Sequence, residues 1–140
     1  MLVVEDPVKL YGGQYIADIP LIISDLYYQE GGVIKTGIHA LGPARDLPTN
    51  PVLGYRFPMD GEGILINGTS GDKNTGFLIK VQANKKYRIR LLNAASNAFY
   101  NFAIAGHDLT VINIGSQATQ PVTLKSIDIG IGQRFDFILD

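Results

Sequence analysis

The chain has 140 residues, and its 12 lysines and arginines nearly balance its 13 aspartates and glutamates. This balance gives no reason to expect nucleic acid or an anionic membrane as a partner. The absence of cysteine excludes disulfides, thiol nucleophiles and thiolate metal sites. No apolar run approaches the roughly 18 residues of a membrane helix, and the first residues lack the features of a signal peptide. The length and the 46% apolar content predict one domain, residues 1–140, with a single core.

Short runs rich in Ile, Val, Tyr and Phe alternate with glycines and prolines along most of the chain, a pattern typical of strands. No stretch keeps a 3.6-residue apolar period for three turns. The predicted strands are Leu2–Val4, Ile19–Tyr27, Ile64–Ile66, Phe77–Val81, Lys86–Asn93, Phe99–Ala105, Asp108–Ile114, Val122–Ile129 and Gln133–Leu139. So many short strands predict an all-β fold, an antiparallel β-sandwich or Greek-key barrel.

The middle of the chain, about residues 29–63, collects Gly, Pro and Asp with little periodicity. A loop of this length inside a domain is usually functional or partly disordered. The segment Val33–Ala40 is a candidate for a short helix.

The stretch after the predicted strand Ile64–Ile66 combines two signals. Asn67-Gly68 is a dipeptide typical of a tight hairpin turn. Asn67-Gly68-Thr69 is also an acceptor sequence for N-glycosylation, so Asn67 is a candidate glycan site if the protein is secreted.

A metal site requires several converging ligands, and the two histidines, His39 and His107, are far apart in the sequence. No metal site is therefore predicted in this chain. His107 lies in a Gly-His-Asp turn between two predicted strands, where its ring can hydrogen-bond backbone groups. We expect it to be structural; catalysis by His107 together with Asp108 is the alternative.

Charged residues occupy alternate positions of two predicted strands. Arg88 and Arg90 share one face of the first, and Arg134 and Asp136 share one face of the last. Opposite charges on neighbouring strands pair with about 0.2 to 1 kcal/mol each. We expect these four side chains to act as structural clamps.

Four segments in order carry a family resemblance: ILINGT, KKYRIRLLNAAS, FAIAGHDLTVI and SIDIGIGQRFDFIL. Together they resemble the second cupredoxin-like domain of laccases and related multicopper oxidases, most closely the fungal ascomycete kind. The segments LVVEDP and IPLIISDLYYQ are similar to the start of that domain. The resemblance covers nearly the whole chain, with a looser fit over about residues 30 to 60.

The resemblance implies a complete enzyme that oxidises phenols and reduces dioxygen to water. It implies three cupredoxin domains, with copper held by the first and third. The second domain is copper-free, bridges the other two, and contributes loops to the wall of the phenol pocket. The histidine of the family's GHxLTVI motif corresponds to His107 and is not a copper ligand. Secretion follows if the chain derives from a fungal laccase.

The resemblance also suggests residues for the pocket loops. These candidates are Tyr55, Phe57, Pro58, Asp72 and Phe77. In many laccases a carboxylate just beyond INGT contacts the phenol, whereas here Phe77 lies near that position and Asp72 is the only close acid. Where the family often has an Asp after TVI, this chain has Gly115 nearby.

The leading hypothesis is a copper-free scaffold and pocket-wall domain that is inactive in isolation. Its partners would be the other cupredoxin domains of a parent oxidase, and a phenol only in the complete enzyme. The alternative is a stand-alone β-sandwich binding module that uses the central loop to hold a ligand or protein. In isolation the apolar segments Val52–Phe57 and Ala98–Phe102 predict self-association as a homodimer.

Overall fold

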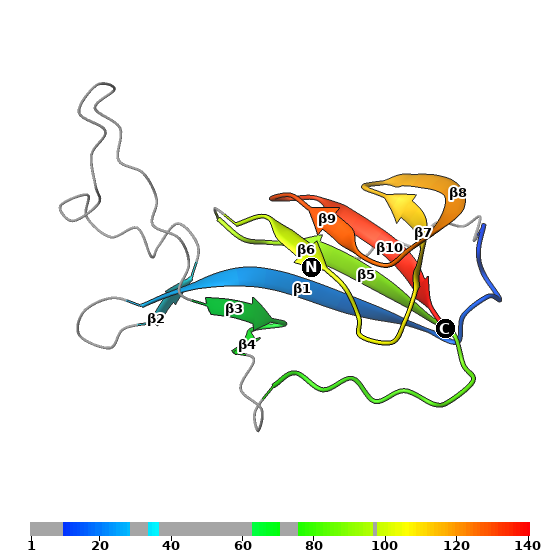
Figure 1. Cartoon of the computed structure of the whole chain (residues 1–140), viewed down its shortest axis with the longest axis horizontal. Helices are drawn as coiled ribbons and strands as arrows, with labels where there is room; N and C mark the ends of the chain where they lie inside the picture. Colours follow the sequence, from blue (N-terminus) through cyan, green and yellow to red (C-terminus); the bar gives the residue numbers. More distant parts are fainter. Residues whose placement is uncertain (1–9, 29–33, 37–62, 71–75, 97) are drawn as a thin grey trace.

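The computed structural model describes residues 10–28, 34–36, 63–70, 76–96 and 98–140, and all regular structure in these ranges is strand (Figure 1). No helix in this part of the chain is long and apolar enough to cross a membrane. The strands are β1 (Ala17–Tyr28), β2 (Ile34–Thr36), β3 (Gly63–Ile66), β4 (Thr69–Ser70), β5 (Tyr87–Asn93), β6 (Tyr100–Phe102), β7 (Leu109–Ile114), β8 (Gln117–Leu124), β9 (Ile127–Ile129) and β10 (Arg134–Leu139). The predicted all-β class is confirmed.

The strands form one large sheet and one small sheet. The large sheet has the order β4-β3-β1-β5-β10-β7-β8, with β2 also paired to β1, and β6 pairs with β9 in the small sheet. β1 and β5 are parallel, with Ala17 opposite Tyr87 and Ile23 opposite Asn93, while the other pairs are antiparallel. The large sheet is therefore mixed, whereas the strand pattern of the sequence predicts antiparallel pairing.

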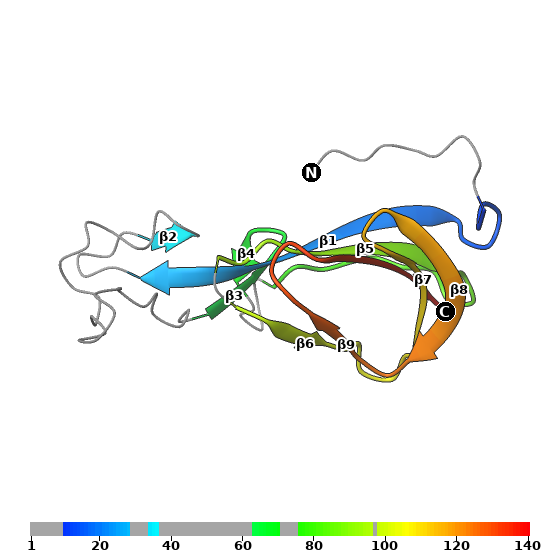
Figure 2. The ribbon, with the colours of Figure 1, turned by 90° about the horizontal axis from the view of Figure 1, so that it is seen from above.

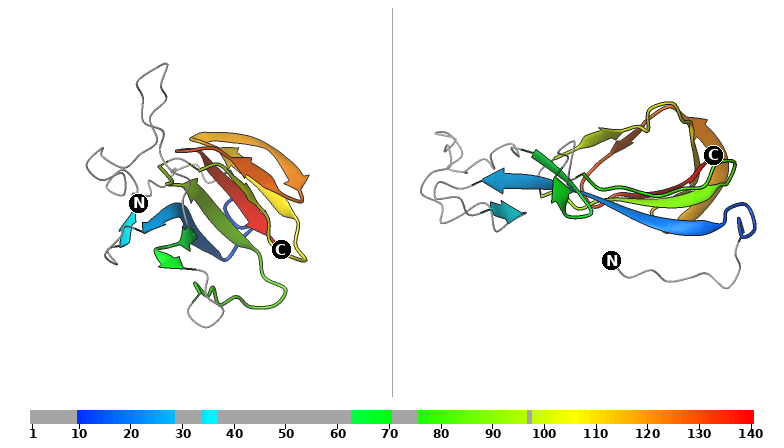
Figure 3. Two further views of the ribbon diagram at one scale, coloured as in Figure 1. Left: turned by 60° about the vertical axis from the view of Figure 1, so that its left-hand side comes forward. Right: turned by 90° about the horizontal axis from the view of Figure 1, so that it is seen from below.

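The small sheet covers one face of the large sheet and closes the core. Seen from above, β6 and β9 form a second layer opposite β5 and β10, and β8 curves from one layer toward the other (Figures 2 and 3). The ring of Phe102 on β6 lies 5.9 Å from the ring of Phe137 on β10. Ile129 on β9 and Phe137 are almost completely buried in the same cluster.

The alternation in β5 shows how the sequence selects the inner face. Residues Tyr87, Ile89, Leu91 and Asn93 are buried, and the residues between them are partly exposed. Successive side chains of a strand point to opposite faces, so one set enters the core. Burying a side chain such as Ile89 or Leu91 contributes about 1.5 to 3 kcal/mol.

Two strand predictions and one helix prediction differ from the structure. Phe77–Val81 is apolar enough for a strand but forms no ladder with any described strand. Only Ile79 of this segment packs against the core, while Phe77, Leu78 and Val81 are exposed. The predicted strand Val122–Ile129 is instead the end of β8 and the whole of β9, which belong to different sheets.

The third difference lies in the candidate helix Val33–Ala40. Residues Ile34–Thr36 form strand β2 against the end of β1, because backbone pairing with an existing strand replaces helical hydrogen bonds there. The remainder of that helix prediction, and the predicted strand Leu2–Val4, lie outside the described residues.

The predicted Asn-Gly turn is confirmed. Asn67 and Gly68 both have positive φ, 49° and 79°, and they join β3 to β4 as a two-residue hairpin loop. Two positive φ values match the twist of the flanking strands, and Asn and Gly adopt them with the least strain.

Candidate functional site

A cluster of four charged side chains lies on the outer face of the large sheet. The register places Asp18 of β1 beside Arg88 of β5, and Asp136 of β10 beside Arg90 of β5. The Arg88 guanidinium donates to Asp136 Oδ2 at 2.5 Å, and Arg90 donates to both carboxylate oxygens of Asp18 at 3.1 and 3.3 Å. The cluster thus joins three neighbouring strands.

Arg88 is the most enclosed arginine of this cluster. Its guanidinium also donates to the Tyr15 hydroxyl at 3.2 Å, and its Cζ lies 5.8 Å from the centre of the Tyr15 ring. Burial lowers the pKa of Arg88, but hydrogen bonding to Asp136 and Tyr15 outweighs this, so its pKa is raised. Arg134 does not join the cluster, since it donates to the Gly132 carbonyl at 3.2 Å.

His107 lies in the exposed turn between β6 and β7. Its Nδ1 is 2.9 Å from the Asp140 carbonyl oxygen, and Gly106 before it has a φ of 79°. The neighbouring Asp108 carboxylate pairs with Lys125 across the start of the β8–β9 connection. The ring therefore contacts Asp140, the residue that follows β10, rather than backbone groups of its own turn.

The Asn67 side chain contacts the backbone of β1. Its Nδ2, the atom to which a glycan would be attached, donates to the Pro20 carbonyl at 3.0 Å. Its Oδ1 accepts from the Ile22 amide at 2.8 Å.

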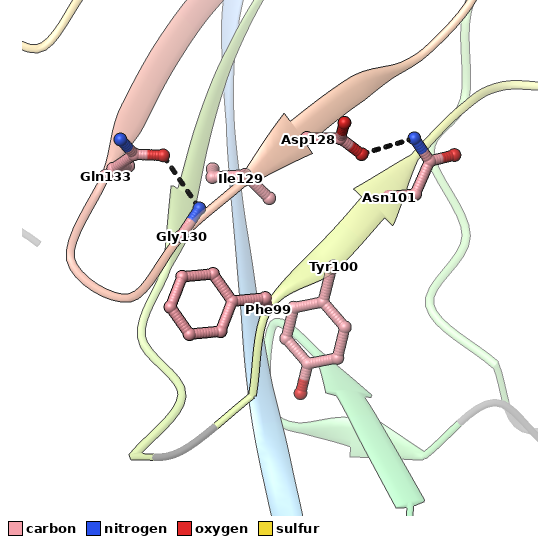
Figure 4. A pocket seen from close by; sticks show the side chains of 7 residues that line it. All are labelled: Phe99, Tyr100, Asn101, Asp128, Ile129, Gly130 and Gln133. Carbon is pink, nitrogen blue, oxygen red and sulfur yellow. Dashed lines mark hydrogen bonds between the residues drawn. The ribbon is translucent and has the colours of Figure 1, made fainter.

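A pocket of about 400 Å³ lies on the small sheet, where β6 pairs with β9 (Figure 4). Its lining residues are Phe99, Tyr100, Asn101, Asp128, Ile129, Gly130 and Gln133. The Phe99 ring is 76% exposed and lies over Gly130, where a Cβ atom would come within 3.0 Å of the ring.

The polar groups around this pocket bind one another. Asn101 Nδ2 donates to Asp128 at 2.7 Å, and the Gly130 amide donates to Gln133 Oε1 at 2.7 Å. The pocket thus combines an exposed aromatic ring and apolar contacts with a carboxylate, Asp128, that already accepts a hydrogen bond from Asn101.

Asn93 binds backbone groups next to the pocket and was not singled out from the sequence. It is completely buried, and its Nδ2 donates to the carbonyls of Ala98 and Ile129 at 2.8 and 3.1 Å. Its Oδ1 accepts from the Ala95 amide at 2.9 Å. One side chain therefore holds the β5–β6 connection against β9.

Asp25 reaches the same connection from β1. It is 1% exposed, and its Oδ2 accepts from the Ser96 amide at 2.8 Å. Burial and the negative charge of Asp25 raise the pKa of the nearby Tyr100. Both Asp25 and Asn93 occupy inward positions of alternating strands, which is the sequence signal that could have identified them.

Only one of the five pocket-loop candidates lies in the part of the chain that the structure describes. Tyr55, Phe57, Pro58 and Asp72 lie outside the described residues, as do His39 and the segment 52–57. Phe77 is described and is 40% exposed, in the segment that leads to β5.

The model of the multicopper oxidase family matches residues 17–140, nearly the whole chain. The chain belongs to the multicopper oxidase family. Its similarity to fungal laccases agrees with the resemblance seen in the sequence motifs: 40% identity over 92 residues to a laccase from Pycnoporus cinnabarinus, and 39% over 92 residues to laccase-2 from Trametes versicolor. Each alignment covers 63% of this chain and 18% of the relative.

Solved structures show the same fold. The laccase from Botrytis aclada matches with a TM-score of 0.67 and 28% identity, over 90% of this chain and 23% of that one. Fet3p, a multicopper oxidase that functions in iron import, matches with a TM-score of 0.75 and 18% identity, over 98% of this chain and 23% of that one. The predicted cupredoxin-like fold is thus confirmed, and the chain spans about a fifth of the length of the curated relatives that it matches.

The family binds copper, but the side chains of this multicopper oxidase domain that the structure describes do not fit a copper centre. No group of three or more His, Cys, Asp or Glu side chains converges within the described ranges. His107 Nδ1 is engaged by the Asp140 carbonyl, and the sequence has two histidines and no cysteine. Blue copper requires a thiolate, and the other copper types in proteins require several imidazoles.

Proposed function

We propose that this chain is the second, copper-free cupredoxin-like domain of a laccase-type oxidase. Its role would be to bridge the copper-bearing domains and to form part of the wall of their phenol pocket, without oxidase activity of its own. The observation that carries this proposal is the family match over residues 17–140 in a chain without cysteine, whose described donor groups do not fit copper.

The geometry supports a scaffold role. The charged cluster of Arg88, Arg90, Asp18 and Asp136 joins three strands, and Asn93 ties the β5–β6 connection to the small sheet. In these contacts the charged and polar groups hold neighbouring strands together. A rigid domain of this kind can orient the loops at its ends, which is what a pocket wall requires.

The partners that we propose are the copper-bearing cupredoxin domains of the parent oxidase, together with a phenol in the complete enzyme. Multicopper oxidases contain several such domains, and this chain matches 23% of the Fet3p chain. We further propose secretion, with Asn67 as the candidate glycan acceptor. The intact mass of the secreted protein before and after enzymatic deglycosylation tests the second point.

The experiment is a domain exchange in the Pycnoporus cinnabarinus laccase. Its matching segment is replaced by that of this chain, and copper content and phenol oxidation are measured beside the parent laccase and the isolated 140-residue chain. We expect the chimera to hold the parent's copper complement and to oxidise phenols, and the isolated chain to do neither. Phenol oxidation by the isolated chain, or a copper-loaded chimera without activity, would contradict the proposal.

A further inference from the structure

The outer face of the small sheet carries side chains that do not enter the core. Asn101 in the middle of β6 and Asp128 in the middle of β9 are exposed, while the residues on either side of each are partly or fully buried. The register places Asn101 opposite Asp128 and, two residues further along, brings Phe99 opposite Gly130. An aromatic ring and a paired amide and carboxylate therefore lie next to each other in the pocket (Figure 4).

The ring of Phe99 is exposed but rests against the backbone. Its Cε1 and Cδ1 atoms lie only 3.0 and 3.3 Å from the position that a Cβ atom at Gly130 would occupy. A larger residue at this position would therefore push the ring away. Gly130 supports one side of the ring, and 76% of the Phe99 residue surface remains accessible to solvent. A ring held in this way can stack on a flat apolar surface with little loss of conformational freedom.

The polar side chains beside the ring have fixed orientations. Asn101 Nδ2 donates to Asp128 Oδ1 at 2.7 Å and to Ser126 Oγ at 3.2 Å. Gln133 Oε1 accepts from the Gly130 amide at 2.7 Å. Within the described residues no partner binds the second ends of these groups, Asn101 Oδ1, Asp128 Oδ2 and Gln133 Nε2. The site thus offers two acceptors and one donor group whose side chains are already oriented.

The combination of ring and polar groups indicates the chemistry of the ligand. A sugar ring has flat faces of C–H groups, which pack on the negative face of an aromatic ring, and an edge of hydroxyls that both donate and accept. A phenol has one hydroxyl and would leave most of the polar groups without a partner. Asp128 is the one charged residue in the described lining of the pocket, which disfavours an anionic ligand. The volume of about 400 Å³ lies near the lower end of the range of ligand pockets, about 300 to 1,000 Å³.

We propose that this face of the small sheet is a binding site for a neutral saccharide. Phe99 is the stacking platform, and Asn101, Asp128 and Gln133 bind the hydroxyls. The site adds a ligand to the scaffold role and does not depend on it. The same sugar chemistry can come from a glucan or from the glycan of a glycoprotein, so the test uses one probe for each source.

The experiment is an NMR titration of the ¹⁵N-labelled 140-residue chain, produced without glycosylation. The probes are cellohexaose, whose equatorial hydroxyls leave C–H groups on both ring faces, and N,N′-diacetylchitobiose, the core of N-linked glycans. We expect saturable shifts of the Gly130 backbone amide and of the Asn101 and Gln133 side-chain amides, with a dissociation constant of about 1 mM for the preferred probe. Sorbitol has hydroxyls but no rigid C–H face, and it should produce no saturable shift.

Two variants test the two parts of the site. Phe99→Ala should weaken binding about tenfold, because it removes the stacking platform. Gln133→Glu keeps an oxygen for the Gly130 amide but loses the donor, and it should weaken binding severalfold. Leu78→Ala is the matched control, because Leu78 is 77% exposed and is not among the residues that line the pocket. All three substitutions are at exposed positions, and unchanged shifts of the β5 amides confirm that each variant is folded.

Several outcomes would overturn the proposal. The first is the absence of a saturable shift with either sugar, and the second is an equal response to sorbitol. Equal weakening by Phe99→Ala and Leu78→Ala would show nonspecific apolar contact. Shifts that follow the protein concentration and not the sugar would identify a second copy of the chain as the occupant. No phenol oxidation enters the measurement, so its result is independent of the proposed function.

Discussion

Arg88 and Asp136 form a hydrogen-bonded ion pair of 2.5 Å between strands β5 and β10, with both side chains largely removed from solvent. Their side chains are 15% and 12% exposed, so water screens the pair less than it screens a surface salt bridge. The same carboxylate lies 3.9 Å from Arg90, which connects the pair to Asp18 on β1. The pair is thus the centre of a cross-strand network and not an isolated surface contact.

Replacing Asp136 by Asn should destabilise the fold. The change leaves the partly buried Arg88 charge without its closest counter-charge, and we expect a loss of about 1 to 3 kcal/mol in the free energy of unfolding. Denaturant unfolding measures it. The control is Asp108→Asn, whose partner Lys125 is 85% exposed and whose loss should stay within about 0.5 kcal/mol. Equal effects of the two changes would contradict the assigned difference in burial.

Asn93→Ala should be more damaging than a polar change on the surface. The variant loses three hydrogen bonds and leaves the buried backbone groups of Ala95 and Ile129, and the partly buried carbonyl of Ala98, without their side-chain partner. We expect a loss of about 2 to 4 kcal/mol. Asn101→Ala, at an exposed position of the neighbouring strand β6, is the control and should change stability little. A stable Asn93→Ala variant would show that other groups can hold the β5–β6 connection.

The charged cluster and the contacts of Asn93 show what could be predicted from the sequence. Alternation placed Arg88 with Arg90, and Arg134 with Asp136, each pair on one face of its strand. The partner Asp18 could not be found that way, because the parallel pairing of β1 with β5 joins residues 70 positions apart. For the same reason the contacts of Asn93 with Ile129, 36 positions away, were not predicted.

The segment Phe77–Val81 is the opposite case. Its apolar composition predicts a strand, but a strand also requires a neighbouring backbone, and none of the described strands provides one. The pattern of apolar residues indicates which side chains tend to be buried. It does not indicate whether a partner strand is present. The Asn-Gly turn was predictable because its cause, positive φ at two adjacent residues, is local.

Tyr100 should make stability depend on pH in the alkaline range. Burial, and then the negative charge of Asp25, raise the pKa of Tyr100 above the ordinary tyrosine value of 10.0, so the folded state favours the neutral phenol. The stability from this preference is fully present below pH 10 and is lost as pH rises through the folded-state pKa. Tyr100→Phe cannot ionise, so its unfolding free energy should fall less steeply over this range. Parallel curves for the two proteins would contradict the pKa shift.

Copper loading should leave no stoichiometric metal on the isolated chain. His107 has one ring nitrogen engaged by Asp140, and no cluster of ligands surrounds it in the described part of the protein. Metal analysis after incubation with copper and desalting measures the retained amount. One tightly held copper per chain that disappears in His107→Ala would contradict this expectation.

Phe99 should promote self-association of the isolated chain. Its ring is 76% exposed beside the pocket on the small sheet, and Ile131 in the adjacent β9–β10 turn is 44% exposed. Neighbouring apolar groups of this kind are typical of surfaces that another protein covers.

Asn93 and Asp25 hold the β5–β6 connection that leads to Phe99, so little conformational entropy is lost when another molecule binds there. We therefore expect concentration-dependent association, most simply a symmetric dimer, in sedimentation experiments.

The variant Phe99→Ser tests the role of this ring. Its control is Leu78→Ser, because Leu78 is equally exposed, at 77%, but is not among the residues that line the pocket. Phe99→Ser should weaken association strongly and Leu78→Ser slightly. Equal weakening would indicate nonspecific apolar contact, and a monomer at every concentration would contradict the role of this surface in self-association.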